Sequence, residues 1–272
     1  KYKDIIPIRG TIFDRNNVPL AVSVINYDLY ALKGFQKSQL LKLSELIELD
    51  IDYLTEVFEK KTLLKKNVSR KNLLEIKKTN LNNFEIEVRH SRHYPLGDQI
   101  APLVGFYGTD GAQEGLEKSY DKVLSGTKGR NKYYKNTKQE IISKPIVVTE
   151  AVQGQDIYLT IDATLQFFAY KHLAEAVKKN KAKSGTAIIL DNKNGQVLAM
   201  ASYPSYNPNH PQRKIQKNRA LVDAYELGSV LKPIMLSKAY DAEVIYSNQL
   251  INLPRRLNLN DKVIVDSKNH EA

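Results

Sequence analysis

The stretch Tyr225-Glu-Leu-Gly-Ser-Val-Leu-Lys-Pro233 decides how this chain is interpreted. Ser229 and Lys232 are three residues apart, so a helix that begins near Ser229 would place both side chains on one face. The glycine before the serine permits a tight turn, and the proline after the lysine would fall in the first helical turn, where its missing N–H costs little. Apolar residues recur through Ile234–Tyr240, and this pattern predicts a buried helix.

This arrangement contains the parts of a nucleophilic site. A serine hydroxyl is a weak nucleophile until a base removes its proton, and a lysine one turn away can act as that base when its pKa is lowered. The N-terminus of a helix adds free N–H groups and positive potential where an oxyanion would form. Ser229 and Lys232 are therefore the candidate catalytic residues of the chain.

The spacing alone is not specific, because the chain contains it three times. Ser119 and Lys122 lie in a polar run, and Ser125 and Lys128 lie in a glycine-bearing turn. We interpret these two occurrences as a solvated helix end and a loop. Only Ser229 combines the spacing with a flanking glycine, a proline and an apolar helix.

The composition describes a globular protein with room for two domains. The chain has 272 residues, of which 42% are hydrophobic and 26% are charged. No apolar run approaches the roughly 18 residues that cross a bilayer. The chain begins at Lys1 without a signal-like segment, which fits a protein trimmed of an upstream signal or anchor.

Residue types exclude several kinds of site. Cysteine is absent, so disulfides, thiolate metal sites and a cysteine nucleophile are excluded. His90 and His93 form the one histidine pair at ligand-like spacing, but no carboxylates cluster beside them. We interpret them as surface or packing residues, and we expect no metal and no cofactor. The net charge of +11 is spread along the chain, which suggests proximity to anionic surfaces or polymers and only weakly nucleic acid, for which the sequence has no aromatic RNA-binding signature or zinc finger.

The first half of the chain mixes strands and helices. Residues 5–29 predict two strands around a turn, residues 36–80 predict three amphipathic helices, and residues 84–88 alternate as a strand. We interpret Arg9 and the Asp14-Arg15 pair as partners in structural ion pairs. A single short helix is expected over residues 116–124, whereas the lysine-rich residues 128–149 show no clear period.

The second half has a clearer plan, and we place the domain boundary near residues 152–154. Residues 157–161 predict a strand, Asp162 can cap the following helix, and residues 186–201 predict a hairpin. A proline-rich loop over residues 203–212 then leads towards the Ser229 helix. This order predicts an α+β fold in which helices pack on an antiparallel sheet.

Together these residues resemble a class B penicillin-binding protein, a monofunctional peptidoglycan D,D-transpeptidase of bacterial cell walls. The resemblance is carried by an ordered set of motifs: Arg9-Gly-Thr-Ile-Phe-Asp14-Arg15, Arg92-His-Tyr94-Pro95-Leu-Gly97, Leu103-Val-Gly-Phe106, Gly115-Leu-Glu117, Leu159-Thr-Ile-Asp162 with Gln166, Val197–Asn209, Asn218-Arg-Ala220 and the Ser229 motif. Leu20-Ala-Val-Ser23 and Asp223-Ala-Tyr-Glu226 resemble the cell-division branch of that family.

The resemblance implies a domain plan and a reaction. Residues 1–152 would form a non-catalytic pedestal with a helical insertion at about 36–80, and residues 153–272 would form the N-terminal portion of a transpeptidase domain. Ser229 would be the nucleophile and a backbone oxyanion donor, and Lys232 would be the general base. The substrate would be a stem peptide that ends in D-Ala-D-Ala, and β-lactams would acylate the same serine.

The resemblance also implies a cellular setting. This region would lie on the periplasmic side of the inner membrane, to which the full protein would be anchored. It would serve septal cell-wall synthesis with glycosyltransferase and divisome partners, and it would bind no nucleic acid.

Two companion motifs of the family, Ser-x-Asn and Lys-Ser/Thr-Gly, are not found where they are expected. Lys183-Ser184-Gly185 and Ser205-Tyr-Asn207 precede the nucleophile, and Ser267-Lys-Asn269 follows it too closely. We therefore expect the chain to end inside the transpeptidase domain and its catalytic centre to be incomplete. A non-catalytic divisome scaffold is the alternative function. A β-lactamase or β-lactam sensor shares the serine motif but does not explain the motifs before residue 152.

Overall fold

The chain folds into two compact units, Lys1–Asp223 and Ala224–Ala272. The structure is a computed structural model that describes residues 2–31, 41, 43–45, 47, 50, 54, 62–66, 68–78, 84–108, 110–134, 143–210, 217–250, 254 and 256–265. Within these residues, no helix combines the length and the apolar character needed to cross a membrane.

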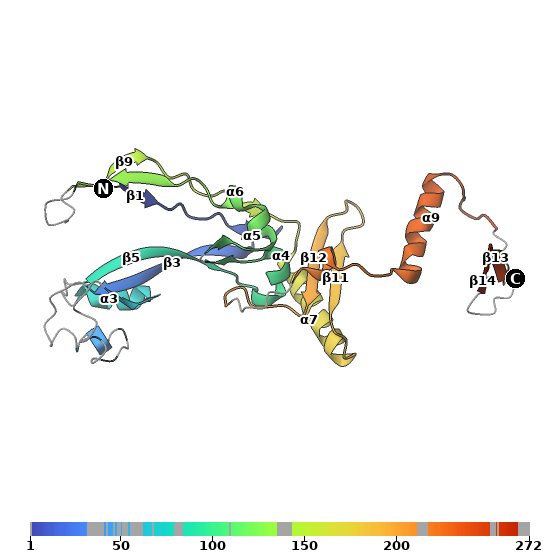
Figure 1. Ribbon diagram of the computed structural model, residues 1–272, viewed down its shortest axis with the longest axis horizontal. Coiled ribbons are helices and arrows are strands. Elements are labelled where there is room, and N and C mark those ends of the chain that lie inside the picture. The colour runs from blue at the N-terminus through green and yellow to red at the C-terminus, as the bar shows by residue number, and fades with distance from the viewer. Residues whose placement is uncertain are drawn as a thin grey trace. The chain divides into compact units, whose positions relative to one another are not determined.

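A long antiparallel ribbon dominates the first part of the chain (Figure 1). β3 (Pro19–Ala31) pairs with β5 (Phe84–His93) over ten residue pairs, and β4 (Thr62–Lys65) pairs with the C-terminal end of β3. β2 (Ile12–Phe13) pairs with the N-terminal end of β3, and β10 (Ile157–Tyr158) pairs with β2 in parallel. The strands predicted in residues 5–29 and 84–88 are therefore confirmed, whereas the strand predicted over residues 157–161 is shorter.

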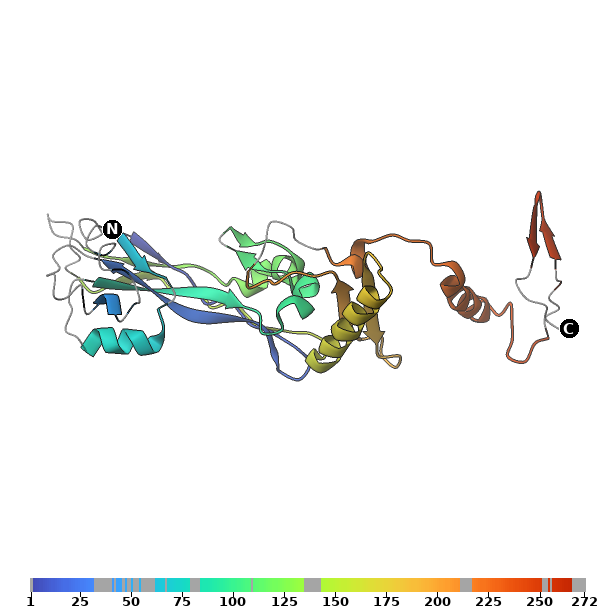
Figure 2. The same cartoon turned by 90° about the horizontal axis from the view of Figure 1, so that it is seen from below.

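A second antiparallel sheet has the order β1-β8-β9. Its strands β1 and β9 are labelled in Figure 1, and Figure 2 shows the same ribbon from below. Its strands are β1 (Tyr2–Ile5), β8 (Gly129–Lys132) and β9 (Ile146–Thr149). Neither β8 nor β9 was predicted, because nearly all their residues are at least partly exposed and no buried face imposes a hydrophobic alternation.

Short helices complete this region. A 3₁₀ turn, η1 (Gly97–Gln99), leads into α4 (Ala101–Val104), and a small ribbon of β6 (Tyr107–Gly108) and β7 (Gly111–Ala112) follows. The helix predicted over residues 116–124 is interrupted at Tyr120. It forms α5 (Gly115–Ser119) and α6 (Asp121–Leu124), because Tyr120 has a non-helical backbone conformation.

The first unit has two hydrophobic cores. One core includes the N-terminal end of β3 and consists of these buried residues: Ile12, Leu20, Ala21, Tyr94, Ile100, Ala101, Val104, Phe106, Leu124, Ile161, Ala163 and Tyr206. The other core includes the C-terminal end of β3 and consists of these buried residues: Leu29, Leu43, Ile47, Leu54, Leu64, Val68, Leu73 and Ile76. α3 (Arg70–Lys78) contributes to the second core and confirms the third helix predicted in residues 36–80. The other two predicted helices lie largely outside the described residues.

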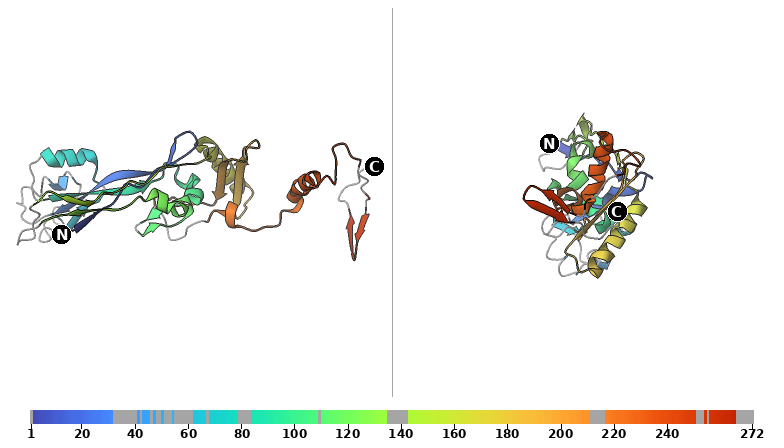
Figure 3. Two further views of the ribbon diagram at one scale, coloured as in Figure 1. Left: turned by 90° about the horizontal axis from the view of Figure 1, so that it is seen from above. Right: turned by 90° about the vertical axis from the view of Figure 1, so that its right-hand side faces the viewer.

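The predicted helix and hairpin after Asp162 are confirmed. α7 (Ala163–Lys179) packs on the antiparallel pair β11 (Gly185–Leu190) and β12 (Val197–Tyr203), as Figure 3 shows. The short helix α8 (Arg219–Val222) ends this unit. Helices therefore pack on an antiparallel hairpin, as the α+β prediction requires.

The second unit contains the candidate nucleophile. A 3₁₀ turn, η2 (Gly228–Val230), continues into α9 (Leu231–Asp241), and β13 (Arg256–Leu259) pairs with β14 (Lys262–Val265). The prediction that this helix is buried is wrong for the described structure, because its apolar side chains are about half exposed, including Ile234 at 58% and Met235 at 62%. Among the described elements of this unit, only η2 contacts α9 extensively, so no surface covers the apolar side chains.

Candidate functional site

Ser229 and Lys232 lie on one turn at the start of α9. Ser229 is the middle residue of η2, Lys232 is the second residue of α9, and Pro233 follows within the first turn. Gly228 has a φ of +55°, a conformation that glycine adopts without strain. The first hydrogen bond of the turn runs from Val230 N–H to the Leu227 carbonyl at 3.2 Å. The N–H of Ser229 belongs to the residue before this donor, at the start of the helix. The sequence pattern predicts an oxyanion donor at this position.

The surroundings of this pair are open. Both residues are exposed, and within the described part of the chain neither side chain makes a hydrogen bond or an ion pair. The geometry therefore supplies a serine and a lysine at adjacent positions of one helix face, but no buried environment around the lysine.

A second group of polar and charged residues surrounds the fully buried carboxylate of Glu117 in the first unit. We call Arg9, Arg92, Tyr94, Glu117 and Asp121 the Glu117 cluster. Arg9 Nε donates to one carboxylate oxygen of Glu117 at 2.7 Å, and Arg92 Nε donates to the other at 2.7 Å. The Tyr94 hydroxyl donates to Glu117 Oε1 at 3.3 Å, and Arg9 Nη1 donates to Asp121 Oδ1 at 2.6 Å. One carboxylate thus joins a segment before β2, the end of β5 and helix α5.

Burial and charge alter the titration of this cluster. Burial, followed by the negative charge of Glu117, raises the pKa of the Tyr94 hydroxyl far above its ordinary value. Desolvation acts to raise the pKa of Asp121, but hydrogen bonds from Ser125 and Arg9 outweigh it and lower that pKa. Tyr94 therefore stays protonated and Asp121 stays ionised at neutral pH, which suits a structural ion-pair cluster. The structural interpretation of Arg9 is confirmed.

Asp14 ties the β2–β3 turn to the start of α7. Its buried carboxylate accepts hydrogen bonds from the N–H groups of Asn16 and Val18, each at 2.7 Å, and from the N–H of Ala163 at 3.0 Å. The other member of the predicted pair is placed by its backbone, since Arg15 N–H donates to the Ile161 carbonyl at 2.9 Å. The Asp14-Arg15 motif thus has a structural role, but within the described residues it acts through hydrogen bonds with backbone groups and not through the ion pair that the sequence analysis predicts.

Asp162 is the N-cap of α7, as predicted. Its side chain accepts from the backbone N–H groups of Thr164 and Leu165 at 2.9 and 3.0 Å. The Leu165 hydrogen bond is the largest cause of a lowered pKa; desolvation opposes it, and bonds from Asn16 and Thr164 reinforce it. The cap is therefore ionised at neutral pH.

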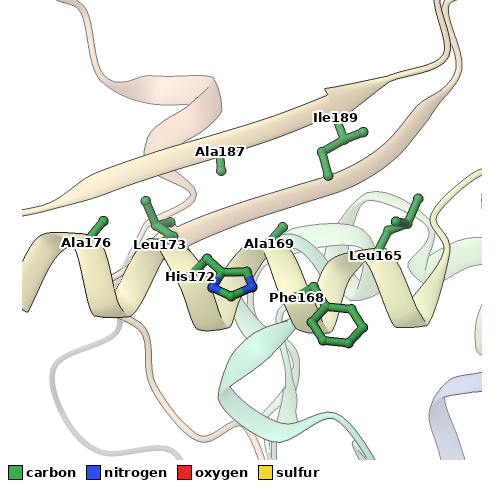
Figure 4. A pocket seen from close by; sticks show the side chains of 8 residues that line it. All are labelled: Leu165, Phe168, Ala169, His172, Leu173, Ala176, Ala187 and Ile189. Atoms are coloured by element: carbon green, nitrogen blue, oxygen red, sulfur yellow. The ribbon is translucent and has the colours of Figure 1, made fainter.

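An apolar pocket lies between α7 and β11. Figure 4 shows Leu165, Ala169 and Leu173 of the helix on the side that faces Ala187 and Ile189 of the strand. His172 lies at its rim, and none of its lining residues is one of the predicted catalytic residues. The pocket is a hydrophobic feature of the helix–hairpin packing and not the candidate active site.

The two histidines at ligand-like spacing lie on β5, where residues three apart point to opposite faces of the strand. Within the described ranges, no group of three or more histidine or carboxylate side chains could hold a metal ion. Of the two Ser-x-Asn sequences that lie outside the expected position, Ser205-Tyr-Asn207 uses its serine in a structural contact, because Ser205 Oγ donates to the Asp98 carbonyl at 2.6 Å. The other, Ser267-Lys-Asn269, lies outside the described residues.

Comparison with known families finds two matches. Residues 4–114 and 109–159 match the penicillin-binding protein dimerisation domain. Residues 185–271 match the penicillin-binding protein transpeptidase domain.

Curated relatives align over most of the chain. It is 37% identical over 259 residues to the probable peptidoglycan D,D-transpeptidase PenA of Neisseria gonorrhoeae, an alignment that includes 90% of this chain. It is 33% identical over 268 residues to the peptidoglycan D,D-transpeptidase FtsI of Escherichia coli, with 92% of this chain included. The chain spans 45% of the length of each of these relatives.

A solved structure has the same fold. Penicillin-binding protein 2X of Streptococcus thermophilus superposes with a TM-score of 0.78 at 24% sequence identity. The superposition includes 98% of this chain and 45% of that structure.

Proposed function

This chain belongs to the class B penicillin-binding proteins, and we propose that the whole protein is a peptidoglycan D,D-transpeptidase whose acylated residue is Ser229. One observation carries the proposal. The serine and the lysine begin a helix within residues 185–271, the part that matches the transpeptidase family.

The proposed reaction uses Ser229 and Lys232 in two transfers. Lys232, as the neutral amine, takes the proton from Ser229 Oγ while that oxygen attacks the carbonyl of the penultimate D-alanine. The peptide bond breaks, terminal D-alanine leaves with a proton, and an acyl-enzyme remains. The amine of a neighbouring stem peptide then attacks the ester, forms the crosslink and releases Ser229. The N–H of Ser229, which precedes the helical hydrogen bonds, is suited to stabilise the oxyanion.

We assign residues 1–152 to a non-catalytic pedestal, with a helical insertion at about 36–80, and residues 153–272 to part of the transpeptidase domain. The buried Glu117 cluster supports a structural role for the first region, because its charges are paired with one another.

The similarity to FtsI of Escherichia coli supports a proposal about the cellular setting. We propose that the protein acts in septal cell-wall synthesis on the periplasmic side of the inner membrane, where the full protein is anchored. Its ligands are stem peptides and β-lactams, and its partners are a glycosyltransferase and other divisome proteins.

The test is the intact mass of the native full-length protein before and after exposure to benzylpenicillin. A β-lactam ring opens without losing atoms, so the expected product is heavier by one whole antibiotic molecule. Ser229→Ala should abolish the adduct, and Ser119→Ala, which changes another serine of the same spacing, should leave it intact. A native protein that gains no adduct would support the non-catalytic scaffold instead.

A further inference from the structure

The outer strand β9 of the β1-β8-β9 sheet has one side without a partner. Within the described part of the chain, β9 pairs only with β8, and β1 forms the opposite edge of the sheet. A free edge presents a row of backbone N–H and C=O groups that can pair with another strand. All four residues of β9 are exposed, including Ile146 at 48%, Val147 at 58% and Val148 at 52%. β9 is therefore an accessible apolar strand.

The two edges of this sheet differ in charge. β1 contains Lys3 and Asp4 among its four residues, and Asp4 pairs with Arg130 of β8 at 3.2 Å. Charged side chains on an edge strand are a common means of preventing edge-to-edge association. β9 has the sequence Ile-Val-Val-Thr, which contains no charge and consists of the β-branched residues that favour strand pairing. The β9 edge therefore lacks the protection that the β1 edge has.

The charged residues that flank β9 make the segment complementary to itself. Lys144 lies three residues before Val147, and Glu150 lies three residues after it. If two copies of the segment pair antiparallel with Val147 opposite Val147, Lys144 of each copy faces Glu150 of the other. Both charged side chains are exposed, and neither forms an ion pair with another described residue of its own chain. Charge complementarity thus favours a second copy of this chain as the partner of the β9 edge.

The charges select one register of this pairing. With the axis through Val147, Ile146 of each copy faces Val148 of the other, and Pro145 lies outside the strand, where its missing N–H is tolerated. With the axis between Val147 and Val148, Glu150 would face Pro145 and both ion pairs would be lost. A parallel arrangement in register would bring like charges together, which destabilises paired strands. The antiparallel register centred on Val147 is therefore favoured.

We propose that β9 is a self-association surface, at which a second copy of this chain pairs antiparallel about a twofold axis through Val147. The two three-stranded sheets then form one continuous sheet of six strands. The paired segment, residues 144–150, is short compared with interfaces that bury about 800 Å² on each partner. The association is therefore weak and depends on protein concentration. It is independent of the proposed acylation of Ser229, so either proposal can fail without the other.

Cysteine crosslinking tests the register, because this chain contains no cysteine of its own. Val147→Cys is introduced into the full-length protein, and disulfide formation under mild oxidation is compared with that of the unsubstituted protein. Directly opposed residues of an antiparallel pair have Cβ atoms about 4.5–5.5 Å apart, close to the reach of a disulfide. Thr149→Cys would place the two thiols about 13 Å apart along the ladder and should crosslink much less. Lys3→Cys, on the opposite edge of the same sheet, is the matched control.

Charge reversal tests the ion pairs across the axis. Sedimentation velocity of the full-length protein over a wide range of concentration measures the dissociation constant for self-association. Lys144→Glu replaces two attractive contacts with two repulsive ones, and Glu150→Lys does the same, so each should weaken self-association by roughly tenfold. An equimolar mixture of these two variants should associate with native affinity, because the changed charges are again opposite across the pair. Lys3→Glu, the same change on the β1 edge, should leave the dissociation constant unchanged.

Two results together support self-pairing at β9: crosslinking of Val147→Cys above that of Thr149→Cys and Lys3→Cys, and native association in the mixture of charge variants. A native protein that stays monomeric at every concentration, with Val147→Cys crosslinked no more than Lys3→Cys, would overturn the proposal and leave β9 open to a strand of another protein. Self-association that the charge variants do not change would also overturn it, because the contact would then lie elsewhere. All the substituted side chains are exposed, so the variants should keep the native melting temperature.

Discussion

Neutralising Glu117 should strongly destabilise the first unit. The carboxylate is fully buried and accepts one hydrogen bond from each of two arginine side chains that are themselves at least nine-tenths buried. Glu117→Gln keeps the shape but replaces one acceptor oxygen with an N–H₂ donor, which must then face a guanidinium. Each charge-assisted hydrogen bond is worth about 1.5–3 kcal/mol, and breaking a buried ion pair by changing one partner costs about 3–5 kcal/mol. We expect a loss of about 3–5 kcal/mol of unfolding free energy.

The assay is urea unfolding followed by circular dichroism at neutral pH. The matched control is Glu175→Gln, which removes an exposed carboxylate 3.3 Å from His172 and should change the unfolding free energy by less than ~1 kcal/mol. Because buried pairs are screened little by salt, the loss in Glu117→Gln should persist at high ionic strength.

A milder variant keeps the test informative if Glu117→Gln does not fold. Arg92→Lys retains the positive charge but loses the planar donor geometry, and it should cost about 1.5–3 kcal/mol. Stabilities of Glu117→Gln and Arg92→Lys within about 1 kcal/mol of the native protein would refute the view that this cluster holds the pedestal together.

Two further predictions concern single positions of the first unit. Gly154→Ala should destabilise the protein by about 1–3 kcal/mol or more, because its methyl group would lie 1.8 Å from the Leu124 carbonyl oxygen. In the control variant Gly195→Ala, the methyl group meets no atom within 4 Å, so the change should cost only backbone strain, about 1 kcal/mol. Equal melting temperatures for the two variants would contradict this. Asp162→Ala should lose about 1 kcal/mol at pH 7 through the missing cap. The folded pKa of Asp162 lies below its ordinary value of ~3.9, so the native advantage should be full above that pH and shrink as the pH falls through the lower folded pKa. Unfolding curves from pH 7 to pH 2 measure it, and an advantage that is constant over this range would contradict the assignment.

Local patterns were sufficient where local interactions decide the structure. The spacing of Ser229 and Lys232 fixed their position on one helical turn, and Asp162 is the cap of α7 as expected. These predictions succeeded because a helix start depends on residues within one turn of it.

Predictions failed where distant residues decide the outcome. β8 and β9 have little hydrophobic alternation, and they are strands because they pair with β1 and with each other. The apolar pattern of α9 predicts a face that can be buried, but burial also requires a covering surface, which the second unit does not provide among its described elements. The pairing of Arg92 with Glu117 and of Asn209 with Tyr94 could not be read from the sequence, since each contact joins segments that only the fold brings together.

Peptide mapping of the labelled protein identifies the residue that is acylated, which we propose is Ser229. The native full-length protein is labelled with benzylpenicillin, digested with trypsin and analysed by tandem mass spectrometry. Because Lys232 precedes Pro233 and resists cleavage, we expect a single adduct on the peptide of residues 220–238, at Ser229. An adduct on Ser119, on Ser125 or on a serine outside this chain, with Ser229 unmodified, would contradict it.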